Sequence, residues 1–460
     1  MMIKIKVEAS TPIVKGQFGD VKISYLEDGV ETKASLSFPD FERLYDFTKE
    51  TDSIEFDLFL ISSIIYAVDD LFARKVWSFN GWTRDFELEI PVRHTNKWAS
   101  VKSEFEDMLS FLTGDLWTLT FKPLLVSNLY LERTNRRKKY IPVFDYDQYK
   151  FASLFSGGLD SLMGVINELK KLGNKEKGVL ISHFDSTYSG PKTDQDQILS
   201  KFAKHYPGRY EHIRTRVKVE SKLSTGKTVS RDLNQRSRSL LFISLGLYLI
   251  RKMPKVNELI IPENGTISLN HPLTPSRSSS LSTRTTHPFF LSSLENILEK
   301  VGVTVILFNP FEFMTKGSMV SKSSDKIVLM STYKDSKSCG KRGHKYHWDN
   351  REARQCGVCM PCIYRRAALH AKSWDNEDFG IDVLKATDFD KLRPDIKALF
   401  DFLKTDLDKG KIKRNLLVDG NIEQSKLDAY ADVVVNSRKE IIKWISDKGN
   451  SKLKKHLGIK

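Results

Sequence analysis

The residues best suited to chemistry gather in one short stretch, Phe151–Gly164, which reads FASLFSGGLDSLMG. An apolar run meets a Ser-Gly-Gly turn, Asp160 and Ser161 follow, and an apolar-periodic segment continues to Leu169. This order predicts a strand, a tight turn and the start of a helix. Free N–H groups at a helix start favour a bound anion, and phosphate is the usual one. The stretch therefore predicts a phosphate-binding loop, to which the hydroxyls of Ser156 and Ser161 add donors.

The motif Ser-Gly-Gly-x-Asp-Ser at 156–161 is similar to the signature of the PP-loop ATP pyrophosphatases. It contains no Gly-Lys-Ser/Thr, so it is not a Walker-type loop. The resemblance implies that the loop holds the pyrophosphate of ATP while a substrate oxygen attacks the α-phosphorus. The product is an adenylated substrate, which a nitrogen or sulfur nucleophile then displaces. A simpler interpretation is that the glycine pair only forms a turn between a strand and a helix.

A second group with chemical potential is a cysteine cluster near residue 350. Its members are Cys339, Cys356, Cys359 and Cys362, which are all the cysteines of the chain. Such clustering in a cytosolic chain indicates metal binding rather than disulfides. Four thiolates around one ion describe a structural zinc site. His344 and His347 lie between the first two cysteines and could replace Cys339, and the same cysteines could instead hold an iron–sulfur cluster or stay as free thiols.

Composition limits the class of protein. The 460 residues are enough for two or three domains, and no apolar run reaches the length that spans a bilayer. The first ten residues alternate like a strand and lack the apolar core of a signal peptide, which predicts a cytoplasmic protein. A net charge of +15 suits anionic partners, with nucleic acid as one option and attraction of ATP as the other.

Hydrophobic periodicity divides the chain into three regions. Residues 1–140 open with alternating strands, as at Ile3–Val7 and Val21–Tyr25, and predict an α+β domain for partner recognition. Within it, 54–77 is interpreted as a strand running into a helix, on which Asp69 and Asp70 form a solvated face. The basic run Glu132–Tyr140 is interpreted as a connector to the next region.

Residues 150–375 alternate between strands and helices. Short β-branched runs at Gly178–His183, Glu258–Ile261 and Val303–Leu307 predict strands, and Arg236–Lys252 predicts a helix. The fold class expected is therefore α/β, with a parallel sheet and helices on both faces. Because ligands bind at the carboxyl ends of such strands, Asp185 and the segment 263–265 are expected beside the glycine loop.

Residues 380–460 form the third region, which is predicted to be helical. The expected helices are Ile396–Leu403, Lys426–Val435 and Lys439–Ile445, and a lysine-rich tail follows at Lys452–Lys460. The serine-rich segment 276–286, within the α/β region, is interpreted as a loop.

Two motifs at opposite ends of 151–371, SGGLDS and CGVCMPC, resemble the 7-cyano-7-deazaguanine synthase (QueC) family. The resemblance implies a Rossmann-like PP-loop core of the adenine nucleotide alpha hydrolase type, ATP and Mg²⁺ as cofactors, and a structural Zn²⁺ on four cysteines. His183–Asp185 resembles the family strand that ends beside the nucleotide. The segments at Arg238 and Lys316 resemble those whose basic residues reach the ATP phosphates.

The chain also departs from that family. About 150 residues precede the loop and about 80 follow the cysteines, and the family's Tyr-Pro-Asp-Cys segment is missing. Large QueC-like proteins of this design occur in bacterial antiphage operons, and the chain is most similar to those of the Qat type, with the CBASS type second. That similarity implies adenylation of a 7-carboxy-7-deazaguanine carboxylate, followed by an amide with an amine, expected to be the N-terminus of an operon-encoded partner protein.

Each candidate site residue has an expected role. Asp160 and Asp185 are expected to position magnesium, Arg238 and Lys316 to balance phosphate charge, Glu263 to bond the deazaguanine, and His287 to act as the base for the amine. The nucleotide-binding and substrate-binding set is Ser156, Gly157, Gly158, Asp160, Ser161, Asp185, Glu263 and Asn264. The catalytic set is Asp160, Ser161, Arg238, His287 and Lys316.

Three further functions fit parts of the pattern. An ordinary 7-cyano-7-deazaguanine synthase would release a nitrile. A tRNA-modifying PP-loop ligase would use the positive charge, although thiolating members need catalytic cysteines that the cluster already occupies. An inactive ATP-binding scaffold would keep its assembly when Asp160 is replaced by alanine, whereas an enzyme would lose turnover.

Overall fold

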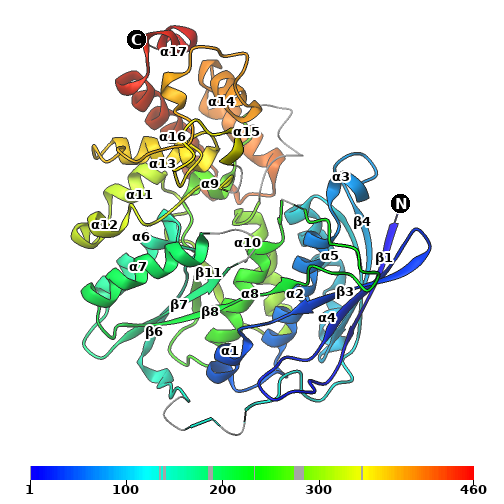
Figure 1. The fold of residues 1–460 in the computed structure, drawn as a ribbon. Helices are drawn as coiled ribbons and strands as arrows, with labels where there is room; N and C mark the ends of the chain where they lie inside the picture. Colours follow the sequence, from blue (N-terminus) through cyan, green and yellow to red (C-terminus); the bar gives the residue numbers. More distant parts are fainter. Residues whose placement is uncertain are drawn as a thin grey trace.

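The structure of the 460-residue chain is a computed structural model. It describes residues 2–133, 136–137, 141–184, 190–232, 234–273, 284–342 and 345–459. Two β-sheets and a helical region make up the molecule (Figure 1). None of the helices in these ranges is both long enough and apolar enough to cross a membrane.

The first sheet is built from the N-terminal part of the chain. Its strands are β1 (Met2–Ala9), β2 (Val21–Glu27), β3 (Val30–Ser37), β4 (Asp85–Val92), β5 (Leu116–Pro123) and β9 (Lys218–Val219). They lie in the order β5-β4-β1-β2-β3-β9, with β1, β4 and β5 parallel and the other pairs antiparallel. In β1 the side chains of Ile3, Ile5 and Val7 are buried and their neighbours are exposed, as the alternation predicts.

Helices of the same region lie near this sheet, and those at 54–71, 95–100 and 102–113 pack against its strands (Figure 1). They are α1 (Phe41–Thr48), α2 (Ile54–Leu71), α3 (Arg74–Trp77), α4 (Thr95–Ser100) and α5 (Lys102–Thr113). The expectation of a strand within 54–77 was wrong. The hydroxyl of Ser53 accepts a hydrogen bond from the N–H of Phe56 and caps α2, which then continues unbroken to Leu71. Helix α2 is buried on all sides, so apolar residues occur on every face of it and the sequence shows no helical periodicity.

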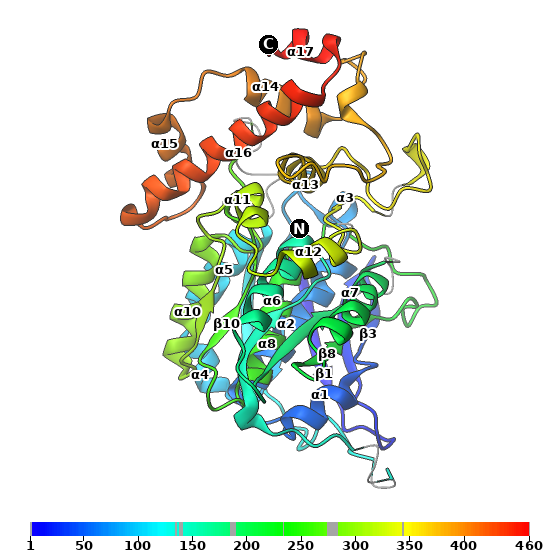
Figure 2. The same cartoon turned by 90° about the vertical axis from the view of Figure 1, so that its left-hand side faces the viewer.

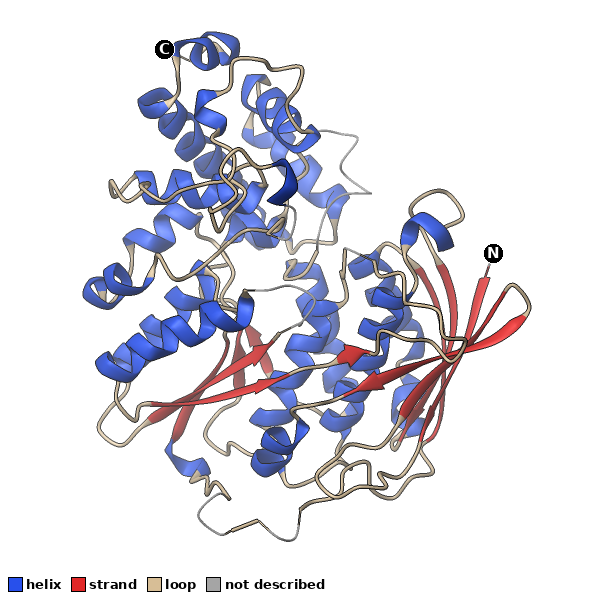
Figure 3. Ribbon diagram, viewed as in Figure 1, coloured by secondary structure: helices blue, strands red, loops and turns tan. Residues whose placement is uncertain are grey.

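The second sheet is parallel throughout (Figure 3). Its strands are β6 (Tyr149–Leu154), β7 (Lys177–His183), β8 (Tyr210–Thr215), β10 (Glu258–Ile260) and β11 (Ile306–Phe308). The order is β11-β10-β6-β7-β8, so strands that follow β6 are added first on one side and then on the other. This reversal is typical of a doubly wound sheet and is compatible with a Rossmann-like core. The predicted α/β class with a parallel sheet is confirmed.

Helices pack on both faces of the parallel sheet. They are α6 (Leu159–Lys171), α7 (Pro191–His205), α8 (Arg238–Ile250), α9 (Gly265–Leu269), α10 (Pro288–Val301), α11 (Lys316–Ser321) and α12 (Lys326–Thr332). In β7, Val179 and Ile181 belong to the core on the α8 side, and Leu180 belongs to the core on the side of α6 and α7. Short 3-10 helices lie at Tyr146–Gln148, Lys345–His347, Val383–Lys385 and Gln424–Lys426.

One hydrophobic core joins the two sheets. Helices α2 and α8 pack against each other between them, and the core continues from the N-terminal sheet to the near face of the parallel sheet (Figure 1). Strand β9, which comes from the middle of the chain, pairs with β3 and extends the N-terminal sheet. The N-terminal region is therefore packed into the α/β core rather than attached by a loose connector. Of the expected connector, residues 132, 133, 136 and 137 are described, and Arg133 and Arg136 form ion pairs with residues of α1.

The C-terminal helices form a second core with the cysteine region (Figure 2). They are α13 (Met360–His370), α14 (Pro394–Lys404), α15 (Lys409–Asp419), α16 (Leu427–Lys448) and α17 (Ser451–Leu457). The helical character predicted for this region is confirmed, with two corrections. The two helices expected between 426 and 445 are the single helix α16, and most of the expected tail is the helix α17, whose Leu453 and Leu457 are buried.

Candidate active site

The glycine loop lies where the parallel sheet changes winding direction. Strands β6 and β10 are neighbours at this point, and the chain leaves their carboxyl ends in opposite directions. The loop 155–158 follows β6, and 261–264 follows β10. Ligands of doubly wound sheets bind at such a reversal. The topology therefore brings together two segments that are about 100 residues apart in the sequence, as expected for Asp160 and Asn264.

The loop itself presents N–H groups to the space above the sheet edge. Gly157 has a φ of +84°, which only glycine adopts without strain, and Gly158 caps α6 without any side-chain hydrogen bond. The Ser156 hydroxyl accepts from the N–H of Gly158 at 3.2 Å and lies 3.1 Å from the Ser161 hydroxyl. The start of α6 is thus left without a capping side chain, as an anion-binding helix start requires.

Asp160, in the first turn of α6, is held by residues from two other segments. The Lys316 ammonium lies 2.8 Å from one carboxylate oxygen of Asp160 and 2.7 Å from the other. The Asn264 side-chain amide donates to Asp160 at 3.0 Å, and its oxygen caps α9 through the N–H of Ile267. Lys316 is the first residue of α11, and it is 3% exposed, so the ion pair is buried.

Glu263 completes this cluster with a second carboxyl group. It is hydrogen-bonded to Asp160, and the Asn264 amide also reaches its oxygen at 3.3 Å. Burial and the charge of Asp160 raise the pKa of Glu263 well above its ordinary value. Burial alone would also raise the pKa of Asp160, but Lys316 and the bonds from Glu263 and Asn264 hold it below its ordinary value. The cluster therefore holds two carboxyl groups with opposed pKa shifts beside the side chain of Lys316.

Three residues that the sequence analysis did not select surround the outer side of the loop. Asp194 in α7 is buried and pairs with the guanidinium groups of both Arg342 and Arg354. A Cβ on Gly157 would lie 3.4 Å from the Cβ of Asp194, so this cluster borders the glycine loop. Two guanidinium groups on one carboxylate leave a net positive charge beside the predicted phosphate site. The sequence gives no signal for it, because the three residues meet only through long-range packing.

The cysteine region contacts the glycine loop directly. The backbone N–H of Lys337, two residues before Cys339, donates to the carbonyl oxygen of Gly157 at 3.1 Å. The Lys337 ammonium is buried against Glu377 at 3.2 Å, and Glu377 also accepts from the Arg365 guanidinium at 2.6 Å. The arm that leads to the first cysteine is therefore fixed at both its backbone and its side chain.

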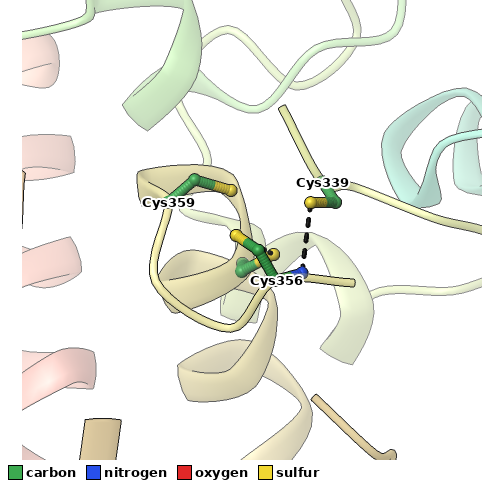
Figure 4. A group of neighbouring side chains, drawn as sticks. Cys339, Cys356 and Cys359 are labelled. Atoms are coloured by element: carbon green, nitrogen blue, oxygen red, sulfur yellow. Dashed lines mark hydrogen bonds between the residues drawn. The ribbon is translucent and has the colours of Figure 1, made fainter. Parts of the chain in front are cut away.

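The four cysteines converge on one point (Figure 4). The sulfurs of Cys339, Cys356, Cys359 and Cys362 all lie within 4.8 Å of one another. Cys356 and Cys362 are 3.9 Å apart, close to the edge of about 3.8 Å that a tetrahedron with zinc–sulfur bonds of about 2.3 Å would have. The N–H groups of Lys341 and Cys356 donate to the Cys339 sulfur, which favours its thiolate form. The predicted clustering is confirmed, and these residues could hold a metal ion such as zinc.

Two predicted catalytic residues lie away from the Asp160 cluster in the described contacts. His287 caps α10: its Nδ1 accepts from the N–H of Phe289, so the ring proton is on Nε2. Burial and the neighbouring Arg284 guanidinium lower the pKa of His287 to about 3. Nδ1 is thus engaged and Nε2 carries a proton, which does not favour a base role. Arg238 begins α8, and its backbone N–H donates to Gln235. Asp185 lies outside the described residues, as does His344.

A buried charge network in the N-terminal region contradicts one expectation. Asp69 and Asp70 are not on a solvated face; both are almost completely buried. Asp69 accepts from the Arg84 guanidinium at 2.6 Å and from the N–H of Ser237, the residue that precedes α8. Asp115 accepts from Arg84 at 2.6 Å and from Arg74 at 2.7 Å. Asp70 pairs with a different arginine, Arg231. The network fixes α2, β4 and the start of α8 to one another.

The chain was compared with known proteins. No protein-family model matches it, and comparisons with curated proteins and with solved structures also gave no match.

Proposed function

We propose that the chain is an ATP pyrophosphatase that adenylates a carboxylate and transfers the acyl group to an amine. The observation that supports this proposal best is the uncapped start of α6 at the winding reversal, beside the ion pair of Asp160 and Lys316. Helix-start N–H groups suit the pyrophosphate of ATP, and an ammonium group next to them stabilises the charge that grows on pyrophosphate as the phosphoanhydride bond breaks.

The proposed first step is a displacement at phosphorus. A carboxylate oxygen of the substrate attacks the α-phosphorus of ATP, an O–P bond forms, and the bond from the α-phosphorus to the bridging oxygen breaks with its electron pair on pyrophosphate. Lys316 and the N–H groups of the loop stabilise that leaving group. Asp160 positions Lys316, since both of its oxygens contact the ammonium group. Arg342 and Arg354 add positive charge on the outer side of the loop.

The proposed second step joins the acyl group to nitrogen. The amine attacks the acyl carbon, the C–N bond forms, the C–O bond to AMP breaks, and the amine proton is lost to a base. On the resemblance to the QueC-like proteins, the acyl substrate is 7-carboxy-7-deazaguanine and the amine is the N-terminus of a partner protein. The raised pKa of Glu263 supports this proposal because it favours the protonated carboxyl group, which can both donate to and accept from the guanidine-like edge of a deazaguanine.

The metal ions implied by the resemblance fit the residues differently. The four cysteines fit zinc, in a set of ligands that leaves no open position and therefore serves structure. Zinc there would order the arm at Lys337 that contacts Gly157. Both oxygens of Asp160 already have partners in Lys316 and Asn264, so this carboxylate does not fit a magnesium ion in this arrangement.

The test is a reaction with defined products. The purified chain is incubated with ATP, Mg²⁺, 7-carboxy-7-deazaguanine and its operon neighbour, and intact mass spectrometry of that neighbour is compared with a control without ATP. We expect a mass gain of one amide-linked deazaguanine, which Asp160→Ala abolishes. A free nitrile product with an unmodified neighbour would indicate an ordinary synthase, and AMP release only with tRNA would indicate a tRNA ligase.

A further inference from the structure

A cavity of about 260 Å³ lies beside the Asp160 cluster, on the outer edge of the parallel sheet. Strand β11 is the edge strand, and helices α10 and α16 supply the other walls. Figure 2 shows α16 above the end of α10. The reaction described above does not use this cavity, and its lining has two properties that indicate a ligand.

The first property is negative charge. Glu295, Glu312 and Glu423 line the cavity, with Lys426 as the single basic residue among its described lining side chains. Lys426 lies 3.7 Å from Glu312 and 3.8 Å from Glu423, so it offsets only part of their charge. Burial raises the pKa of Glu295, so a cation bound beside it would stabilise the ionised form of this carboxyl group. An acidic cavity in a chain with a net charge of +15 favours a cationic occupant.

The second property is a pair of buried polar groups with no hydrogen-bond partner among the described residues. The Nδ2 amide of Asn309 and the hydroxyl of Thr286 have none, although each residue is only 8% exposed. Both residues line the cavity. The Asn309 oxygen is already used, since it accepts from the N–H groups of Glu263 and Phe311. Its Nδ2 donor is therefore available to an acceptor on a ligand, and a buried donor without a partner is costly.

One short segment of the chain connects the lining of the cavity to the candidate active site. Asn309 and Glu312 line the cavity, and four residues after Glu312 the chain reaches Lys316, which pairs with Asp160. Asn309 also bonds the backbone of Glu263, a member of the Asp160 cluster. A ligand in the cavity would thus lie next to the residues proposed to adenylate the acyl group.

We propose that this cavity binds the amine substrate as an α-ammonium group with a carbonyl group two bonds away, as at the N-terminus of a peptide. The carboxylates of Glu295 and Glu312 receive the ammonium group, and the Asn309 amide donates to the carbonyl oxygen. This inference rests on the proposed function, and it assigns the place where the second substrate of that reaction binds. The volume exceeds that of ammonia several-fold and suits one or two small residues.

The test measures binding to the full chain without catalysis. Isothermal titration calorimetry compares triglycine amide, glycinamide and N-acetyl-triglycine amide. We expect the first two to bind and the acetylated peptide not to bind, because acetylation removes the charge. Tighter binding of triglycine amide than of glycinamide would assign a peptide terminus, and equal binding would assign a small amino-acid amide. Equal binding of the acetylated peptide would overturn the proposal.

Variants test the residues named. Glu295 accepts a hydrogen bond from the N–H of Leu307 at 2.7 Å. Glu295→Gln keeps an oxygen for this bond and removes the negative charge. Together with Glu312→Gln it should weaken triglycine amide binding by about 10-fold or more, the range of a hydrogen bond to a charged group. Glu299→Gln, an exposed change of the same charge on α10, is the matched control and should have no effect. Unchanged binding in the double variant, with circular dichroism showing a folded chain, would overturn the proposal.

A further variant tests the donor separately. Asn309→Asp keeps the oxygen that holds Glu263 and Phe311 but replaces the Nδ2 donor by an acceptor. This variant should bind glycinamide more weakly than the wild type does. Its affinity for propylamine, which lacks a carbonyl group, should not fall. An equal loss of affinity for both amines would overturn the carbonyl contact. Pyrophosphate exchange into ATP, measured without any amine, reports adenylation alone. If pyrophosphate exchange is absent while peptide binding is intact, the proposed function is rejected and the proposed binding site in the cavity is not.

Discussion

Two buried clusters of charged residues lie in this molecule, and they differ in balance. In the N-terminal region, Asp69 and Asp115 pair with Arg74 and Arg84, whose side chains are at most 5% exposed, and the buried Arg236 adds a third guanidinium group beside them. At the carboxyl edge of the parallel sheet, Asp160 and Glu263 share one ammonium group, that of Lys316.

The difference separates a structural role from a functional one. The first cluster places each carboxylate within ion-pair distance of two guanidinium groups and joins α2, β4 and α8, which is a structural role. The second raises the pKa of one carboxyl group, Glu263, and borders a helix start that no side chain caps. Groups with opposed pKa shifts side by side are typical of catalytic sites. The comparison predicts that changes in the first cluster affect stability and changes in the second affect activity.

The largest expected effect is on the free energy of unfolding of Asp69→Asn. This change removes one carboxylate from a buried network and leaves Arg84 with surplus charge, which costs about 3–5 kcal/mol. Urea denaturation followed by circular dichroism measures it. A loss below about 1 kcal/mol would show that the network does not stabilise the fold and would remove the contrast between the two clusters.

Lys316→Met should act mainly on catalysis. Loss of one preorganised group that stabilises charge in a transition state lowers rates by about 10²–10³-fold. Pyrophosphate exchange measures the rate, and denaturation of the same variant measures stability. Lys322→Met, on the exposed end of the same segment, is the matched control. A variant that unfolds but retains full activity per folded molecule would contradict the assignment.

Glu263 should make stability depend on pH. Its pKa is raised from 4.5 in the folded chain, so above that pH the folded chain holds one proton more than the unfolded chain. The free energy of unfolding then falls as pH rises, by at most about 1.4 kcal/mol per unit, until the raised pKa is passed. Glu263→Gln cannot titrate and should lack this loss.

Asp160 has the opposite sign, because its pKa lies below 3.8 and its stabilising contribution is lost only as the pH falls from there. Between pH 5 and 8 the difference between wild type and Glu263→Gln therefore reports Glu263. Parallel stability curves for the two proteins over that range would mean that Glu263 is ionised like an exposed glutamate.

The smallest effect is expected for Arg354→Gln. Asp194 keeps Arg342 as a partner, so stability should change by less than about 1 kcal/mol. ATP affinity, measured by calorimetry, should fall several-fold because positive charge beside the loop is lost. The double variant Arg342→Gln/Arg354→Gln should lose far more stability and far more ATP affinity than the single variant. Small and additive effects would show that the two arginines do not share one carboxylate.

Sequence reasoning succeeded where the signal is local. Strands β1, β2 and β4 alternate because one face is buried, and the glycine loop is recognisable as strand, turn and helix within fourteen residues. The cysteine spacing predicted a cluster because two residues separate each neighbouring pair among the last three cysteines. At this spacing two cysteines can bind the same metal ion.

Sequence reasoning failed where packing between segments distant in the sequence determines the structure. Helix α2 has no period because both of its sides are covered, and the burial of Asp69 depends on Arg84 and Ser237, which are far apart in the sequence. The sequence predicted two helices, at 426–435 and 439–445, where the structure has the single helix α16. The pairing of Lys316 with Asp160 required the strand order, which the sequence does not specify.

The most direct test of the central claim is the identity of the products of ATP. The chain is incubated with ATP, Mg²⁺, 7-carboxy-7-deazaguanine and the partner protein, and ³¹P NMR follows the phosphorus species. Cleavage at the α-phosphorus predicts AMP and pyrophosphate in equal amounts, with none from Lys316→Met. ADP and inorganic phosphate, or no turnover while ATP binds, would contradict it.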